Sequence, residues 1–288
     1  MKRITICAMF IALSSFIFAQ TYMSVWKNGV KMDMQISAID SITFGDTETS
    51  NGIGIFSVSP NDKVTFSKGN LQYHPKKNKW QFANNQYDYF GEANENISAD
   101  YNGWIDLFGW GTGNNPTKAT ANTNDYKTFV DWGTNQIGED APNTWRTLTK
   151  AEWEYLISSR PNADKLCVSG NIKIDGSNFG ECGLILLPDN WINPDDVEVS
   201  MEYYNNEFTI EQWFILEQSG AVFLPGAGER YKLEFRSSGS DGYYWSATGL
   251  SNNEDARYLR TTYGLSQPWK FEAGYRFLGY SIRLVKDL

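Results

Sequence analysis

Several segments of this chain alternate apolar and polar residues, and such a two-residue period predicts β-strands with one buried face. Two short segments instead carry helix signals. Thr149 stands three residues before Glu152, and Thr209 stands three residues before Gln212, which is the spacing of a helix capping box. We therefore predict one helix that begins at residue 150 and a second that begins at residue 210.

Apolar residues flank both predicted caps. Leu148 and Trp153 lie on either side of the first cap, and Phe208 and Trp213 flank the second in the same way. Such pairs close as hydrophobic staples that direct the entering chain toward the core. The first helix should end at Arg160-Pro161, because the residue before a proline disfavours the helical conformation.

The start of the chain has the pattern of a signal peptide, which we place at residues 1–19. Lys2 and Arg3 precede an apolar run that ends at Phe18, and the small residue Ala19 follows. The run is too short for a comfortable transmembrane helix, and Cys7 lies inside it instead of just after it, which argues against a lipid anchor. We expect a secreted or cell-surface protein with no transmembrane segment in the mature chain.

The next segment, residues 20–45, predicts a small hairpin module. Asn28-Gly29 separates two alternating stretches and favours the positive φ angles of a type I′ turn. The apolar pattern continues through residues 36–44 into a third extended piece. Residues 46–53 are mostly polar and without period, which indicates a linker, and the remaining residues 54–288 form one large domain.

The large domain opens with segments typical of a β-meander, in which residues 71–74 should pair with residues 80–82. Residues 184–187 are apolar at every position, which favours a central strand. Residues 91–143 show neither the helical nor the strand period, so a long irregular loop is expected. The predicted fold class is α+β, with two short helices, antiparallel sheets and long irregular loops.

The first helix also carries a resemblance to a known family. Arg146-Thr147-Leu148-Thr149, followed by Ala151-Glu152-Trp153-Glu154-Tyr155, resembles the R-L-P-T-x-A-E-W-E-Y signature of the formylglycine-generating-enzyme family. Residues 242–247 and 279–285 fall where that family has its G-N-V-W-E-W and G-F-R-x-V elements. Over residues 54–288 the resemblance implies a C-type lectin-like domain, closest to non-catalytic secreted bacterial relatives, in which a long loop is an ordered insertion held by its own tryptophans.

Catalytic equipment is not expected. The chain has one histidine, His74, and lacks the sequence motifs of the common hydrolases, nucleotide-binding proteins and zinc proteins. The oxidases of the resembled family bind copper through a cysteine pair late in the domain, and no cysteine follows Cys182 here. The formal net charge is −9, and loss of Lys2 and Arg3 would make it about −11, which disfavours nucleic acid as a partner.

Tryptophans outside the predicted helices and strands are the first candidates for binding, because sugar rings offer apolar C–H faces to aromatic surfaces. By contrast, Trp145, Trp153, Trp213 and Trp245 lie in predicted regular elements and are expected in the core. Gln267-Pro268-Trp269 retains only the Q-P of the Q-P-D that many sugar-binding C-type lectins use with calcium. The residues that we expect to contact a ligand are Trp104, Trp110, Asn114, Asn115, Trp132, Gln267 and Trp269.

Two further sets of side chains leave alternatives open. Asp106, Asp125 and Asp131 offer oxygen ligands for a calcium ion, although Asx turns that stabilise the glycine-rich loop are the simpler interpretation. Cys167 and Cys182 could form a disulfide in an oxidising compartment or remain two free thiols, since the strand register is not known from the sequence.

These patterns favour a secreted, non-catalytic binding or surface protein that recognises a glycan or another protein at the cell exterior. One alternative is an enzyme of the formylglycine-generating superfamily with an atypical active site. Another is a structural subunit of an exported assembly.

Overall fold

The chain divides into two units in the computed structural model, residues 1–47 and residues 48–288, and each is described by itself. The structure describes residues 22–27, 30–35, 52–174, 180–200, 206–236, 239–265 and 267–288. The predicted signal peptide, the third extended piece at 36–44 and most of the predicted linker lie outside these residues. Within the described ranges, no helix is long and apolar enough to span a lipid bilayer.

The N-terminal unit contains the predicted hairpin. Strands β1 (Tyr22–Lys27) and β2 (Val30–Gln35) pair antiparallel, with Lys27 opposite Val30. An ion pair of 2.7 Å joins Lys31 to Asp33 on β2. The strand pairing expected from Asn28-Gly29 is confirmed.

The first helix, α1 (Lys150–Glu154), begins at the predicted residue. Glu152 N–H donates to Thr149 Oγ1 over 3.2 Å, and Thr149 N–H donates to Glu152 Oε2 over 2.7 Å, which completes the capping box. A π-helical turn, η6 (Tyr155–Ser159), continues α1 and ends before Arg160-Pro161.

The second helix, α2 (Ile210–Gln218), also begins at its predicted capping box, formed by Thr209 and Gln212. Its staple residues Phe208 and Trp213 are both buried in one core cluster. Leu148 and Trp153 are likewise buried together beneath α1. Both helix predictions are therefore confirmed.

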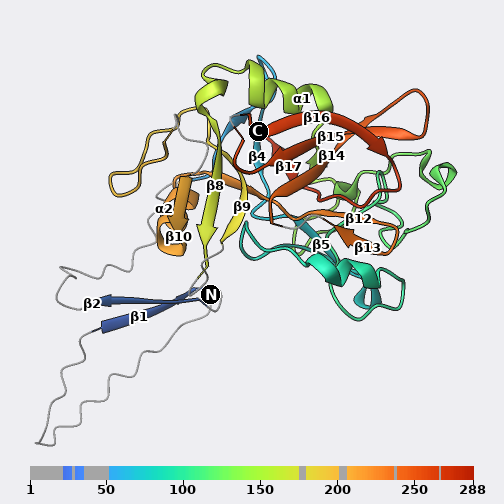
Figure 1. Cartoon of the computed structure of the whole chain (residues 1–288), viewed down its shortest axis with the longest axis horizontal. Helices are drawn as coiled ribbons and strands as arrows, with labels where there is room; N and C mark the ends of the chain where they lie inside the picture. The colour runs from blue at the N-terminus through green and yellow to red at the C-terminus, as the bar shows by residue number, and fades with distance from the viewer. Residues whose placement is uncertain are drawn as a thin grey trace, which may run out of the picture. The chain divides into compact units, whose positions relative to one another are not determined.

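The last strand of the chain returns to the start of the large unit. β17 (Leu284–Asp287) lies between β4 (Lys63–Phe66) and β7 (Arg146–Thr147), and β3 (Phe56–Ser57) completes this antiparallel sheet. Figure 1 shows the C-terminus beside β4. The sheet thus joins residues from both ends of the domain.

A second sheet has the predicted central strand. β9 (Glu181–Leu186) is buried from Gly183 to Leu186. Its Ile185 lies in the same core cluster as Trp213 and Leu216 of α2. One pairing differs from the antiparallel prediction, because β10 runs parallel to β8 after the chain has crossed to the far edge of the sheet. In spatial order the strands are β10 (Asn206–Thr209), β8 (Cys167–Lys173), β9 (Glu181–Leu186) and β11 (Val222–Pro225).

A third sheet contains β16 (Trp269–Tyr275), a strand that the sequence did not predict. Trp269 was expected in a loop but is the first residue of this strand. The strands of the sheet are β14 (Asp241–Gly249), β15 (Asp255–Thr262) and β16. Two short antiparallel pairs complete the described strands. They are the predicted β5 (Leu71–His74) with β6 (Lys79–Phe82), and β12 (Glu229–Tyr231) with β13 (Glu234–Arg236).

The long segment 91–143 is irregular but ordered. Its side chains Ile105, Phe108, Trp110 and Trp132 are buried in the core cluster beneath β5, β6 and β14. Short 3-10 helices lie within this segment, and two more lie in connections elsewhere in the domain. These turns are η2 (Pro75–Lys77), η3 (Gly91–Asn96), η4 (Thr123–Tyr126), η5 (Trp132–Thr134) and η7 (Ala163–Lys165).

Candidate functional site

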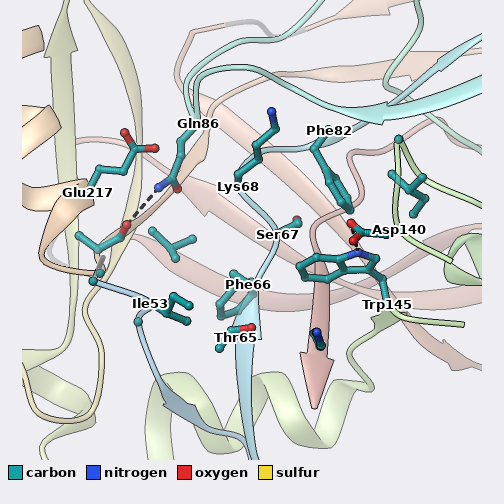
Figure 2. Close-up of a pocket in the computed structure, with 18 of the residues that line it drawn as sticks. Ile53, Thr65, Phe66, Ser67, Lys68, Phe82, Gln86, Asp140, Trp145 and Glu217 are labelled. Carbon is teal, nitrogen blue, oxygen red and sulfur yellow. Dashed lines mark hydrogen bonds between the residues drawn. The ribbon is translucent and has the colours of Figure 1, made fainter. Parts of the chain in front are cut away.

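A groove of about 660 Å³ lies where β4, β6 and β17 meet the end of α2. We call it the Trp145 groove, after the aromatic side chain on one of its walls. Figure 2 shows Trp145 and Asp140 on one side of it and Glu217 on the other. Residues far apart in the sequence, from Gly52 to Lys286, therefore build one cavity.

Trp145 is held in a fixed orientation on this wall. Its indole Nε1 donates to Asp140 Oδ2 over 2.9 Å, and its ring meets Phe82 edge to face with centroids 5.1 Å apart. The side chain is half-buried, so part of the indole stays open to solvent. The expectation that Trp145 belongs wholly to the core is wrong, because its position before β7 places it at the rim of the core.

The floor of the groove is fixed by a buried amide. Gln86 Oε1 accepts from Phe223 N–H over 2.7 Å and from Arg283 Nη2 over 2.5 Å, and Gln86 Nε2 donates to Ala221 O over 3.1 Å. Burial lowers the pKa of Arg283 to about 10. These bonds engage Gln86 within the protein, so it acts as a support and not as a ligand contact.

At one end, the backbone at Gly54 and Gly220 approaches too closely for side chains. A Cβ atom on Gly220 would lie 2.8 Å from Gly54 Cα, and Gly220 has a φ of +94°, which favours glycine. Gly52 N–H donates to Gln218 O over 2.9 Å and ties this segment to the end of α2. The groove is therefore closed at this end by backbone.

The rim carries charges of both signs. Lys68 and Lys286 contribute positive groups, and Glu139, Asp140 and Glu217 contribute negative ones. Neutral amides and hydroxyls lie between them, on Gln81, Asn84, Thr65 and Ser67. The lining thus combines an aromatic face with many hydrogen-bonding groups.

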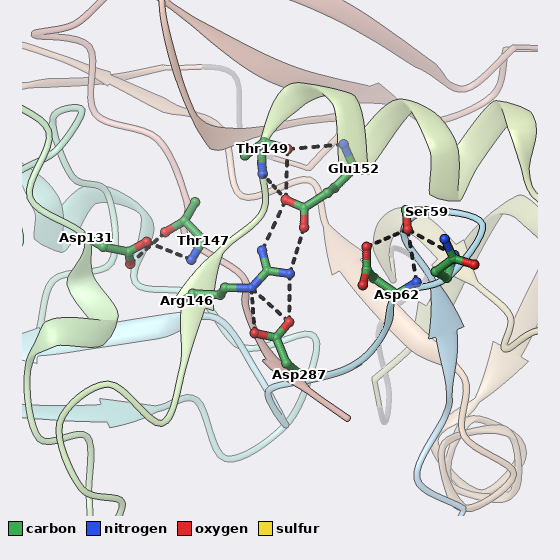
Figure 3. Close-up of polar contacts among 9 residues, drawn as sticks. Ser59, Asp62, Asp131, Arg146, Thr147, Thr149, Glu152 and Asp287 are labelled. Atoms are coloured by element: carbon green, nitrogen blue, oxygen red, sulfur yellow. Dashed lines mark hydrogen bonds and ion pairs between the residues drawn. The ribbon is translucent and has the colours of Figure 1, made fainter.

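The residues that resemble the family signature are held by polar contacts with other parts of the fold (Figure 3). The Arg146 guanidinium binds Glu152 over 2.7 Å and Asp287 over 2.7 Å. Asp131 accepts from Thr147 N–H over 2.9 Å. The signature thereby joins β7, α1 and β17, and these contacts engage its charged groups.

Two of the predicted ligand-contacting tryptophans are buried and cannot offer a stacking face. Trp132 is 0% exposed, and Trp110 is 4% exposed. Trp110 Nε1 donates to Ser246 O over 2.9 Å, and the Arg276 guanidinium lies 4.3 Å from its ring centroid. Both rings hold the 91–143 segment on the core, so this part of the site prediction is corrected.

The other predicted contact residues are dispersed over the surface. Asn114 and Asn115 are exposed, and Asn114 borders a separate cavity of about 310 Å³ that Trp110 and Asp125 also line. Gln267 is exposed beside β16, and Trp269 packs on Phe271 with ring centroids 6.0 Å apart. The structure thus brings Trp110 and Asn114 together but does not gather all the predicted contact residues into one site.

Trp104 is half-exposed and lines a different groove, of about 610 Å³. Its ring meets the ring of His74 nearly at right angles, with centroids 5.1 Å apart. His74 is buried, and its Nδ1 accepts from Lys77 N–H over 3.4 Å. The single histidine therefore supports the β5–β6 turn and Trp104.

The three aspartates proposed as calcium ligands do not converge. Asp106 is buried and accepts from Asn94 Nδ2 over 2.8 Å, Asp125 is exposed and accepts from Thr120 Oγ1 over 2.5 Å, and Asp131 caps η5. Within the described ranges, no three or more His, Cys, Asp or Glu side chains are grouped to hold a metal ion. These carboxylates engage local backbone and side-chain donors, so of the two interpretations the structure favours local hydrogen bonding.

Cys167 and Cys182 are free thiols. They lie on the adjacent strands β8 and β9, but Cys167 is opposite Leu186 and Cys182 is opposite Asn171. This offset of four residue pairs is about 13 Å along the strands, whereas a disulfide needs Cα atoms within about 7 Å. The strand register therefore favours two free thiols over a disulfide.

Comparisons of the chain with protein-family models, with curated proteins and with solved structures find no match. The resemblance to the formylglycine-generating family thus stays a prediction, and the α+β class is what the structure supports. Sequence reasoning missed Trp145, Lys68 and Lys286 as groove residues. Trp145 lies two residues beyond the predicted irregular segment 91–143, in a stretch assigned to the core.

Proposed function

We propose that this chain is an exported, non-catalytic binding protein that recognises a carbohydrate in the Trp145 groove. The observation that carries the proposal is the half-exposed indole of Trp145, held by Asp140 on the wall of a cavity rich in hydrogen-bonding groups. An aromatic face that is already oriented loses little conformational entropy when a sugar ring stacks on it.

The rest of the lining supports a carbohydrate over other ligands. Besides its aromatic and aliphatic side chains, the groove presents amide, hydroxyl, ammonium and carboxylate groups that can hydrogen-bond the hydroxyls of a sugar. Its two lysines face three carboxylates, and the chain carries a formal net charge of −9, which disfavours strongly anionic polymers. A neutral or weakly charged sugar chain fits this balance.

A glycan array followed by calorimetry on residues 20–288 tests the proposal. Trp145→Ala should weaken binding of the retained glycan about tenfold or more, since loss of roughly 1.4 kcal/mol is a factor of ten. Binding should persist in EDTA, because no described group of residues is placed to hold a metal.

Trp191→Ala is the matched control. Trp191 is also half-buried, and its Nε1 also donates over 2.9 Å to a side-chain oxygen, that of Asn193, but it lies outside the groove. Its loss should leave glycan affinity unchanged. Equal affinities for the wild type and Trp145→Ala, or no retained glycan at all, would overturn the proposal.

A further inference from the structure

The groove that contains Trp104 adjoins the Trp145 groove. Gln81 and Asn84 line both cavities, and no other residue is shared between them. Gln81 Nε2 donates to Gln72 Oε1 over 2.9 Å across β5 and β6, which fixes the side chain at the boundary. A ligand that passes over Gln81 and Asn84 would therefore reach both grooves.

The second groove has a different chemical character. Four aromatic residues line it, together with two carboxylates, Asp88 and Glu181. Among the described residues that line it there is no lysine, arginine or histidine. The aromatic residues are Tyr87, Tyr89, Phe90 and Trp104.

Its carboxylates have no cationic partner. Neither Asp88 nor Glu181 takes part in an ion pair within the described part of the chain. The Tyr89 hydroxyl hydrogen-bonds to Glu181, and Asn85 N–H donates to Asp88 Oδ2 over 3.0 Å. Partial burial raises the pKa of Glu181, and an arriving cation would offset the cost of that burial.

We infer that this second groove binds the protonated amino group of an amino sugar, carried by the same glycan chain that stacks on Trp145. Aromatic rings attract ammonium groups through their negative faces, and a half-buried carboxylate adds a charged acceptor. A neutral acetamido group offers no charge to either. This inference rests on the proposed carbohydrate-binding function.

Two tetrasaccharides that differ only in N-acetylation provide the test. They are the β-1,4-linked tetramer of glucosamine and the tetramer of N-acetylglucosamine, titrated calorimetrically at about pH 6, where an alkylamine is protonated. The wild type should bind the amino tetramer at least about tenfold more tightly. Equal affinities would overturn the inference.

Variants assign the preference to the second groove. Glu181→Gln keeps the size of the side chain and an acceptor for Tyr89, and Trp104→Ala removes one of the four aromatic residues of the groove. Each should abolish the preference by weakening the amino tetramer more than the acetylated one, and Trp145→Ala should weaken both tetramers. Glu198→Gln, at an exposed glutamate outside both grooves, should behave as wild type. A preference that persists in Glu181→Gln would contradict the inference.

Failure of the proposed function is distinguishable from failure of this inference. If neither tetramer binds, glucosamine and N-acetylglucosamine are compared by their effect on the NMR signal of the Trp104 indole N–H. A shift caused by glucosamine but not by N-acetylglucosamine would support the amino-group site in the second groove. It would overturn the proposal that a glycan chain binds in the Trp145 groove. No shift, or tighter binding of a trilysine peptide than of the amino tetramer, would overturn the amino-sugar site.

Discussion

Arg146 and Asp287, 141 residues apart in the chain, are joined by three hydrogen bonds. Arg146 Nη2 donates to Asp287 Oδ1 over 2.7 Å, and Nε donates to both carboxylate oxygens. The same guanidinium binds Glu152, which also completes the cap of α1. One side chain therefore couples the start of α1 to the last strand of the domain.

Removal of Arg146 should destabilise the domain more than removal of its exposed partner. Arg146→Ala should lower the free energy of unfolding by about 1–3 kcal/mol, because it leaves Glu152 without its charged donor. Asp287→Asn should cost at most about 1 kcal/mol, since that carboxylate is largely exposed. Urea titrations at low salt and at about 1 M salt measure both, and the Asp287 effect should shrink at high salt.

Glu154→Gln provides the control for this prediction. It removes only the exposed i,i+4 ion pair with Lys150, so its effect should be a few tenths of a kcal/mol. An Arg146→Ala variant no less stable than Glu154→Gln would refute the coupling role of Arg146.

The tryptophans of the long segment should differ in their effect on stability. Trp132→Ala should cost about 3–5 kcal/mol, because it empties a fully buried site. Trp104→Ala should cost about 1 kcal/mol, since that ring is half-exposed. Trp132→Phe should recover much of the loss, because Trp132 Nε1 has no hydrogen-bond partner among the described residues. Denaturant titrations of the three variants measure this, and equal losses for Trp132→Ala and Trp104→Ala would contradict it.

Asp106 should make stability fall as the pH rises. It is fully buried, and burial outweighs its bonds to Asn94 and Phe90 N–H, raising its pKa to about 6. Between about pH 4 and pH 6 the folded state therefore holds a proton that the unfolded state has released. Ionisation of Asp106 should therefore lower the free energy of unfolding by up to about 3 kcal/mol between pH 4 and pH 7.

The comparison of wild type with Asp106→Asn isolates this contribution, because other titrating groups cancel. Urea titrations at pH 4, 5, 6 and 7 should show the variant gaining stability relative to wild type as the pH rises. A difference that stays constant over this range would show that Asp106 keeps an ordinary pKa.

The two cysteines should behave as independent free thiols. Burial raises the pKa of the Cys167 thiol to about 12, so the native protein should resist alkylation at that residue near pH 8. Intact-mass analysis after labelling should show Cys167 modified only in denaturant, and a reducing agent should not change the unfolding midpoint. A mass two hydrogens lower before reduction would instead reveal a disulfide.

Local contacts explain what the sequence by itself determined. The capping boxes at Thr149 and Thr209 depend on side chains within three residues of each other, and both are present. The pairing of β5 with β6 depends on one short turn, and the continuous apolar run of residues 184–187 required burial on both faces. These features need no knowledge of distant partners.

The tertiary structure alone decided the site. The sequence placed Trp132 at a ligand and Trp145 in the core, yet Trp132 is fully buried and Trp145 forms the wall of a groove. The fate of each ring depends on which distant elements cover it. In the same way, the separation of Cys167 from Cys182 depends on strand register. A cavity whose lining runs from Gly52 to Lys286 exists only once the last strand has returned to the first sheet, because its walls come from opposite ends of the domain.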